Sequence, residues 1–122
     1  MNEERWLEAF PGAVTICDPQ GIILAMNEAA ARAFQEQGGK ALIGANALDC
    51  HPEPAREKMQ HLLETQGTNV YTIEKGGKKR LIYQAPWYDG GAFGGLVELS
   101  LEIPTDMPHF VRDRPAPLAG AP

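Results

Sequence analysis

A predicted strand, a tight turn, a second strand and a helix cap follow one another without interruption between Phe10 and Asn27. Two apolar runs, Ala13–Cys17 and Ile22–Met26, flank the turn sequence D-P-Q-G at positions 18–21. Aliphatic and β-branched residues bounded by turn formers predict the two strands of a β-hairpin. Asn27 then predicts the N-cap of a helix that begins at Glu28. Because no residues separate these elements, we expect this unit to be the nucleus of the fold.

Helices are predicted before and after this hairpin. Residues 1–10 can form a short amphipathic helix, and residues 28–37 can form an alanine-rich helix that ends at two glycines. A longer helix is predicted for residues 54–67, because Pro54 suits a first helical turn. Four apolar residues of this helix fall on one face: Ala55, Met59, Leu62 and Leu63.

Three more strands are predicted at residues 70–74, 78–88 and 94–103, with glycine turns between them. Every second residue from Val97 to Ile103 is apolar, which predicts one buried face and one face in water. Pro86 predicts a bulge or an unpaired position in the middle strand. Two strands, a helical block and three strands indicate an α+β fold with helices on one face of an antiparallel sheet.

The composition is that of one globular domain. A chain of 122 residues that is 43% hydrophobic can form one core but not two. The net charge of -5 argues against direct nucleic-acid binding, which needs clustered Lys and Arg. No apolar run approaches the ~18 residues of a membrane span, and the polar N-terminus is unlike a secretory signal. We therefore expect a cytoplasmic protein without membrane contact. Residues 104–122 are rich in proline and are expected to form a disordered tail.

Few residues offer chemistry. The chain contains no Gly-rich phosphate loop, G-x-S-x-G elbow or H-E-x-x-H pattern, so we predict no enzyme activity and no catalytic residue. Cys17 and Cys50 are too few for a disulfide scaffold, and we predict no metal site. The run Cys50-His51-Pro52 has two interpretations: a redox-sensitive thiolate beside an imidazole, or a small buried hydrophobe beside a histidine that hydrogen-bonds to the backbone.

Four motifs in order resemble a PAS domain over about residues 8–103. The segment D-P-Q-G-I-I-L-A-M-N is similar to the Asp-x-x-Gly…Asn pattern that opens such domains, and A-L-I-G-A-N is similar to their Ile-Gly turn. The segment Y-D-G-G-A-F-G-G-L-V-E-L resembles their last hairpin, and L-D-C-H-P resembles a subgroup with a Cys-His-Pro motif. PAS domains commonly end in Asp-Ile-Thr and a signalling helix, whereas Glu102-Ile103-Pro104 stands here. We therefore expect a stand-alone module that acts in trans or by dimerisation.

The resemblance implies a five-stranded antiparallel sheet in the order 2-1-5-4-3 with helices on one face. The PAS domain would span residues 11–103, between the N-terminal helix (1–10) and the tail (104–122). Ligands of such domains lie between the sheet and the helix at 54–67, although the same side chains could simply fill the core. The candidate ligand-binding residues are Leu48, Cys50, His51, Met59, Leu62 and Leu63.

Haem-binding members of the family take a histidine from this helix. At roughly 100° per residue, His61 lies about 145° from the centre of the apolar stripe and should face solvent. Haem or flavin is therefore possible as a cofactor, but neither is supported by a specific motif.

The resulting prediction is a sensory or protein-interaction module in signal transduction that responds to a small ligand or to redox state. We expect a homodimer whose interface is formed by Trp6, Leu7 and Phe10 together with the exposed sheet face, and a possible signalling partner in trans. One alternative is a small thiol-dependent enzyme that uses Cys50 and His51. Another is a structural adaptor without a ligand.

Overall fold

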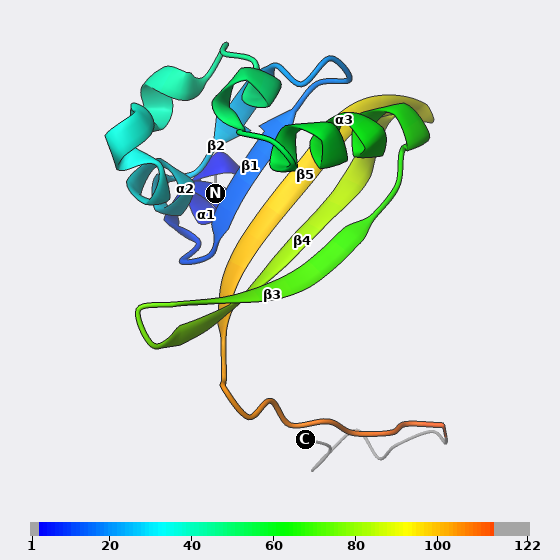
Figure 1. Cartoon of the computed structure of the whole chain (residues 1–122). Helices are drawn as coiled ribbons and strands as arrows, with labels where there is room; N and C mark the ends of the chain where they lie inside the picture. The colour runs from blue at the N-terminus through cyan, green and yellow to red at the C-terminus, as the bar shows by residue number, and fades with distance from the viewer. Residues whose placement is uncertain (1–2, 114–122) are drawn as a thin grey trace.

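The computed structural model describes residues 3–113 as a five-stranded antiparallel sheet with helices across one face (Figure 1). The sheet order is β2-β1-β5-β4-β3, which confirms the predicted order. No helix within residues 3–113 has the length and apolar character needed to cross a membrane. In chain order the elements are α1 (Glu3–Ala9), β1 (Ala13–Cys17), β2 (Ile23–Met26), α2 (Glu28–Ala33), the short 3-10 helices η1 (Gln35–Gln37), η2 (Gly39–Leu42) and η3 (Ala47–Cys50), α3 (Ala55–Thr65), β3 (Asn69–Lys75), β4 (Lys78–Asp89) and β5 (Ala92–Ile103).

The first hairpin forms as predicted, and its turn is held by Asp18. The Asp18 Oδ1 atom accepts hydrogen bonds from the backbone N–H groups of Gln20 and Ile22, both at 2.9 Å. This aspartate therefore satisfies two turn donors that no strand partner could reach. β1 pairs with β2 on one side and with β5 on the other, so the hairpin forms one end of the sheet, with β2 as an edge strand.

Asn27 caps α2 and also joins the helix to the strands. Its Oδ1 atom accepts from the backbone N–H groups of Ala30 and Val14, both at 3.0 Å. Its Nδ2 atom donates to the carbonyl oxygens of Leu7 (3.0 Å) and Gly12 (2.8 Å). Only 2% of the residue is exposed, and the bonds with Val14, Gly12 and Ala30 are buried, where each broken one is costly.

Two predicted elements differ from the structure. The helix predicted for residues 28–37 ends at Ala33 and continues as the 3-10 helix η1, because Phe34 leaves the helical conformation at φ -106°. Pro86 is paired in register with Leu96, and the bulge lies one residue later, between Trp87 and Tyr88. Proline is tolerated there because the pairing of β4 with β3 ends at Gln84, so Pro86 is unpaired on that side of the strand.

The tail was predicted to be disordered over residues 104–122. Residues 104–113 contain no helix or strand and lead away from the sheet (Figure 1). Residues 114–122 of that prediction, and residues 1–2 of the predicted N-terminal helix, lie outside the described residues.

The two faces of the sheet are distinguished by which side chains meet the helices. We call the face toward α2 and α3 the inner face and the opposite one the outer face. Leu96 and Glu98 of β5 line a cavity beneath the helices, so Leu99 and its apolar neighbours two residues away point outward. This corrects the sequence-based expectation, in which the apolar row was the buried one: Leu99 is half-buried on the outer face, and Glu98 is half-buried on the inner face.

Trp87 marks the point where β4, β5 and β1 meet. Its Nε1 atom donates to the carbonyl oxygen of Cys17 at 3.0 Å, although the two residues are 70 positions apart. The indole lies against Gly94, where an added Cβ would come within 2.6 Å of the ring. At Gly95, φ is +127° and an added Cβ would lie 1.9 Å from the Cys17 carbonyl oxygen, so only glycine fits this crossing.

Candidate ligand-binding cavity

The hydrophobic core is divided into two clusters with a cavity between them. One cluster joins the first hairpin to α2 and η3 and consists of Ala13, Ile23, Met26, Ala30 and Ala47. The other joins β1 and β5 to α3 and consists of Cys17, Leu62, Leu63 and Leu96. Met59 packs against both clusters. The space between them has a volume of about 260 Å³, so the residues of the sheet and helices do not fill the core.

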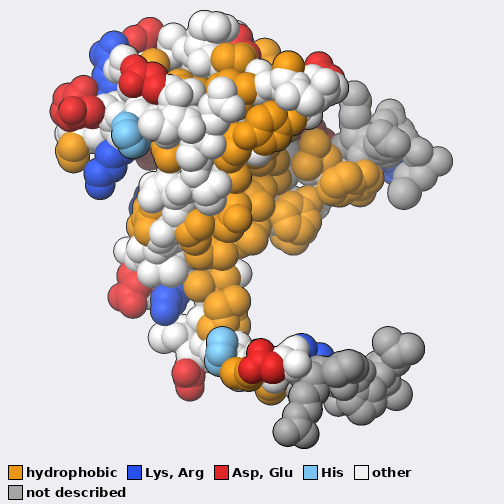
Figure 2. Space-filling model, turned by 90° about the vertical axis from the view of Figure 1, so that its right-hand side faces the viewer, with side chains coloured by type: hydrophobic (Ala, Val, Ile, Leu, Met, Phe, Trp, Pro, Cys, Tyr) orange, Lys and Arg blue, Asp and Glu red, His pale blue; other side chains and the backbone are white. Residues whose placement is uncertain are grey.

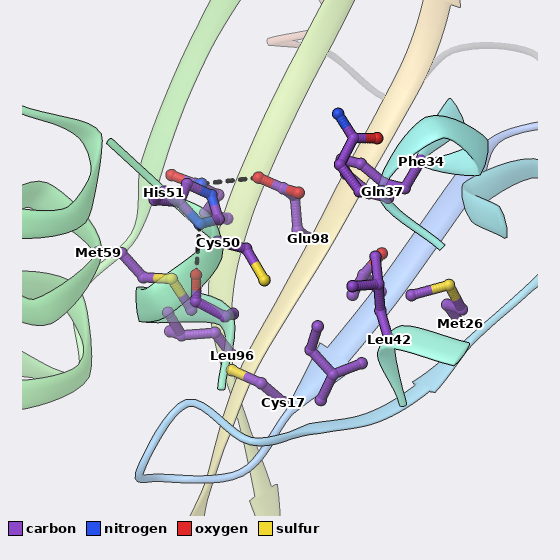
Figure 3. Close-up of a pocket in the computed structure, with 14 residues that line it drawn as sticks. Cys17, Met26, Phe34, Gln37, Leu42, Cys50, His51, Met59, Leu96 and Glu98 are labelled. Carbon is purple, nitrogen blue, oxygen red and sulfur yellow. Dashed lines mark hydrogen bonds between the residues drawn. The ribbon is translucent and has the colours of Figure 1, made fainter. Parts of the chain in front are cut away.

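The cavity wall is mostly apolar and rich in sulfur (Figure 3). Two methionines and two cysteines reach it from separate elements: Cys17 from β1, Met26 from β2, Cys50 from η3 and Met59 from α3. Thioether side chains are flexible and polarizable, so this wall can adapt to the shape of an apolar molecule. The remaining lining residues are Thr15, Ile23, Phe34, Gln37, Leu42, Ala47, His51, Gln84, Leu96 and Glu98.

A chain of hydrogen bonds holds one carboxylate at this wall. Asn69 Nδ2 donates to Gln84 Oε1 at 3.0 Å, and Gln84 Nε2 donates to Glu98 Oε1 at 2.8 Å. Because the oxygen of the Gln84 amide is already engaged by Asn69, its nitrogen must face Glu98. Three strands, β3, β4 and β5, therefore fix the position of the Glu98 carboxylate.

His51 stands at the cavity beside Cys50 but is turned to the backbone. Its Nδ1 atom lies 2.6 Å from the carbonyl oxygen of Ala47, and since a carbonyl only accepts, Nδ1 carries the proton. The Cys50 Sγ atom contacts the carbonyl oxygen of Asn46 at 3.7 Å. The imidazole thus bonds to the 3-10 helix η3 and not to the neighbouring thiol, as the second interpretation of the Cys-His-Pro run predicted for the histidine. Cys50 itself is exposed, unlike the buried hydrophobe of that interpretation.

Burial and the charge of Glu98 affect two nearby acids. Burial raises the pKa of the Cys17 thiol above its ordinary value, and the charges of Asp18 and Glu98 also raise this pKa. A hydrogen bond from the Leu96 backbone lowers the pKa but does not cancel the rise. Burial also raises the pKa of the Tyr71 phenol, with a second contribution from Glu98. For both groups burial is the largest cause of the raised pKa, and the negative charge of Glu98 acts in the same direction.

The candidate residues predicted from the sequence divide into three groups. Cys50, His51 and Met59 line the cavity. Leu62 lines an adjoining groove beside α3. Leu48 and Leu63 do not lie on the cavity wall: Leu63 is buried in the second core cluster, and Leu48 packs against it. Binding by any of the six stays a prediction.

Other residues near the cavity differ in how well they were anticipated. His61 is exposed, as its position on the helix predicted, and lies on the adjoining groove. Gln84 and Glu98 were not among the predicted site residues, although polar side chains within otherwise apolar strands were a signal that could have identified them. Within residues 3–113, no three His, Cys, Asp or Glu side chains are grouped so that they could hold a metal ion.

The predicted dimer surface can also be located. Trp6 is 58% exposed and Phe10 is 39% exposed, whereas Leu7 is half-buried. Phe10 lies next to Leu101 of the outer face, because a Cβ added at Gly12 would meet both side chains. Figure 2 shows one side of the molecule, on which apolar side chains form a broad band and the surface is hollowed above the C-terminal segment.

Comparison with known proteins agrees with this architecture. A family model described as the PAS fold matches residues 7–103, whereas a search of the curated proteins found no match. Among solved structures, a C-terminal domain from Streptococcus mutans is similar at 20% identity and a TM-score of 0.65, covering 79% of this chain and 78% of that one.

Two further similar structures are PAS domains of named bacterial proteins. The PAS domain of BvgS from Bordetella pertussis has 18% identity and a TM-score of 0.60, with 82% of each chain covered. The Aer2 receptor from Vibrio cholerae, described as a dual PAS-heme oxygen sensor, has 18% identity and a TM-score of 0.56, covering 76% of this chain and 95% of that one. At these identities the structural likeness is one of fold.

Proposed function

Because the chain belongs to the PAS fold family, we propose that it is a sensory module of a signalling system and that a small molecule in the cavity is its signal. The observation that carries this proposal is the divided core, with a cavity of about 260 Å³ between its two halves. A core that served only stability would gain by closing such a space, since each unfilled volume forfeits packing contacts.

The proposed mechanism is a shift between two arrangements of the same fold. Glu98 faces the cavity and Leu99 is its neighbour in β5, on the outer face. A ligand that moves the β5 backbone at Glu98 therefore also moves the apolar row on the other side of the sheet. The ligand biases the equilibrium by the difference in its affinity for the two arrangements.

The proposed output is association through the outer face with a second copy of this chain. The outer face is continuous with the exposed aromatic residues of the N-terminal segment, since Phe10 adjoins Leu101. Contiguous apolar surface of this kind is typical of association sites. We place the module in the cytoplasm, where the dimer or a signalling protein in trans would carry the response.

The thiol of Cys50 offers a second input to the same cavity. It is exposed and also lines the cavity wall, so an oxidant can reach it and a modified side chain would change the shape of the site. If redox state is the signal, mild peroxide should alter self-association of the wild type but not of Cys50→Ser. An equal response in both proteins would exclude this input.

Native mass spectrometry of the purified protein tests the proposal most directly. We expect a retained small molecule, or a mass shift on incubation with a metabolite mixture, and a dimer that weakens in Trp6→Ala/Phe10→Ala. A protein that never gains mass, and whose association is the same under all conditions, would instead be a structural adaptor.

A further inference from the structure

The charge of the cavity wall is one-sided. Among the described residues that line it, Glu98 is the single carboxylate, and none is a lysine or an arginine. Within the described part of the chain, Glu98 makes no ion pair; Lys58 lies on the adjoining groove without reaching it. A half-buried carboxylate without a cation is unfavourable unless hydrogen bonds or a ligand compensate it.

The hydrogen bonds that reach Glu98 orient it without neutralising it. Its Oε1 atom accepts from the Gln84 amide, whose own position is set by Asn69. The second carboxylate oxygen receives no hydrogen bond from the described residues and is open to a donor. The neutral form of His51 adds an acceptor at the same cavity, because its Nδ1 proton is used by the Ala47 carbonyl and Nε2 is then the nitrogen with a lone pair.

The rest of the wall sets the size and character of the remaining part of a ligand. Aliphatic and thioether side chains from both core clusters surround the space. A volume of about 260 Å³ divided by the ~30 Å³ that one water occupies gives room for about nine such units. A ligand of roughly this many non-hydrogen atoms with one polar end would fill the space.

We propose that the cavity binds a small amine, with the protonated nitrogen paired to the Glu98 carboxylate and the apolar body lying between Met26 and Met59. This inference rests on the proposed function, since it names the class of ligand that the sensory module would detect. The ammonium group supplies the charge that the wall lacks, and its several N–H donors suit both Glu98 and the His51 Nε2 atom. The net charge of -5 on the chain also favours the approach of a cation.

The test compares three compounds that have nearly the same shape and differ in charge: 2-phenylethylamine, 2-phenylethanol and phenylacetate. Their dissociation constants are measured by calorimetry on the full chain at neutral pH, and NMR of the Met26 and Met59 methyl groups locates the bound compound. We expect the amine to bind at least about tenfold more tightly than the alcohol, as for a charge-assisted hydrogen bond. The carboxylate should bind most weakly of the three.

The variant Glu98→Gln should remove the preference for the amine, because it keeps an oxygen for Gln84 but loses the charge. The matched control is Glu102→Gln, on the same face of β5 but outside the cavity, where Glu102 pairs with Lys78 at 3.6 Å. The control should keep the wild-type preference. If Glu98→Gln does not fold, the ranking of the three compounds on the wild type still decides the question.

The inference is overturned if the alcohol or phenylacetate binds as tightly as the amine, if Glu98→Gln keeps the preference, or if no compound shifts the two methionine methyl signals. Failure of the proposed function looks different. In that case the amine binds with the expected preference, but saturating amine leaves self-association unchanged. Conversely, a retained native ligand without an amine would defeat this inference and leave the sensory function standing.

Discussion

Where β4 and β5 pair, the inner and outer faces of the sheet carry different kinds of side chain. On the inner face, beneath the helices, Gln84 bonds to Glu98, and farther along the sheet Arg80 bonds to Ser100. On the outer face, apolar side chains follow one another along the paired strands β4 and β5, with Tyr83 directly opposite Leu99. The helices therefore cover the apolar residues of the first hairpin and also polar side chains of β4 and β5.

Under the proposed function, this difference assigns a task to each face. Paired polar groups under the helices would distinguish one small molecule from another. Half-exposed apolar groups on the other side would gain by association. Successive side chains of β5 point to the two faces in turn, so each inner-face residue is joined to an outer-face residue by one peptide bond.

The largest expected change in stability comes from Asn27, which joins the helices to the sheet. Asn27→Ala removes a buried amide that bonds to α1, β1 and α2, and we expect it to lower the free energy of unfolding by about 3 kcal/mol or more. Urea denaturation measures the change. The matched control is Asn46→Ala, which removes the half-exposed cap of η3 and should cost about 1 kcal/mol. Equal losses in the two variants would show that Asn27 is no more than a helix cap.

A charge introduced on the outer face should weaken association of the folded protein. Leu99→Asp places a carboxylate in the apolar row, and we expect the dissociation constant of the dimer to rise about tenfold or more. Sedimentation equilibrium measures it. Gln60→Asp adds the same charge to an exposed position on α3, on the opposite side of the sheet from the outer face, and should leave association nearly unchanged. A dimer that survives Leu99→Asp would place the interface elsewhere.

Replacing the polar pair on the inner face with apolar side chains should stabilise the fold, whereas Asn27→Ala should destabilise it. We expect Gln84→Leu/Glu98→Leu to raise the free energy of unfolding by about 1 kcal/mol, because the polar pair is replaced by side chains that pack into the cavity. Thermal and urea denaturation measure it. Glu98→Leu alone should gain less, since it leaves Gln84 without its acceptor. A less stable double variant would mean that the polar pair supports the fold.

The smallest expected effect is a dependence on alkaline pH. Burial raises the folded-state pKa of Cys17 above its ordinary value of 9.0, so folding favours the protonated thiol. That stabilisation is fully present below pH 9.0 and is lost as the pH rises through the folded-state value. Tyr71 acts in the same direction above its ordinary value of 10.0. Cys17→Ala should flatten the fall in unfolding free energy just above pH 9, and an unchanged slope would contradict the assignment.

Much of the fold followed from local signals in the sequence. The turn at Asp18 and the cap at Asn27 depend on side chains that bond to backbone a few residues away, so spacing along the chain was sufficient. The apolar stripe of α3 identified the side of the helix that meets the core. The strand order came from the resemblance to a family and not from any pairing rule.

The orientation of the sheet and the composition of the cavity did not follow in this way. Alternation along β5 distinguishes two faces, but which face the helices cover depends on contacts between residues far apart in sequence. For the same reason Met59 and Leu63 share one helical stripe, yet only Met59 lines the cavity. Glu98 was assigned to water because its partners, Gln84 and Asn69, lie on two other strands.

The crossing at Trp87 provides the molecule with an optical reporter of its own. The indole bonds to the carbonyl oxygen of Cys17, whose side chain forms part of the cavity wall. Fluorescence emission from that ring should respond when the cavity is occupied. The chain contains one other tryptophan, Trp6, on the exposed N-terminal helix, so Trp6→Phe leaves a single emitter and allows occupancy to be followed without an added dye.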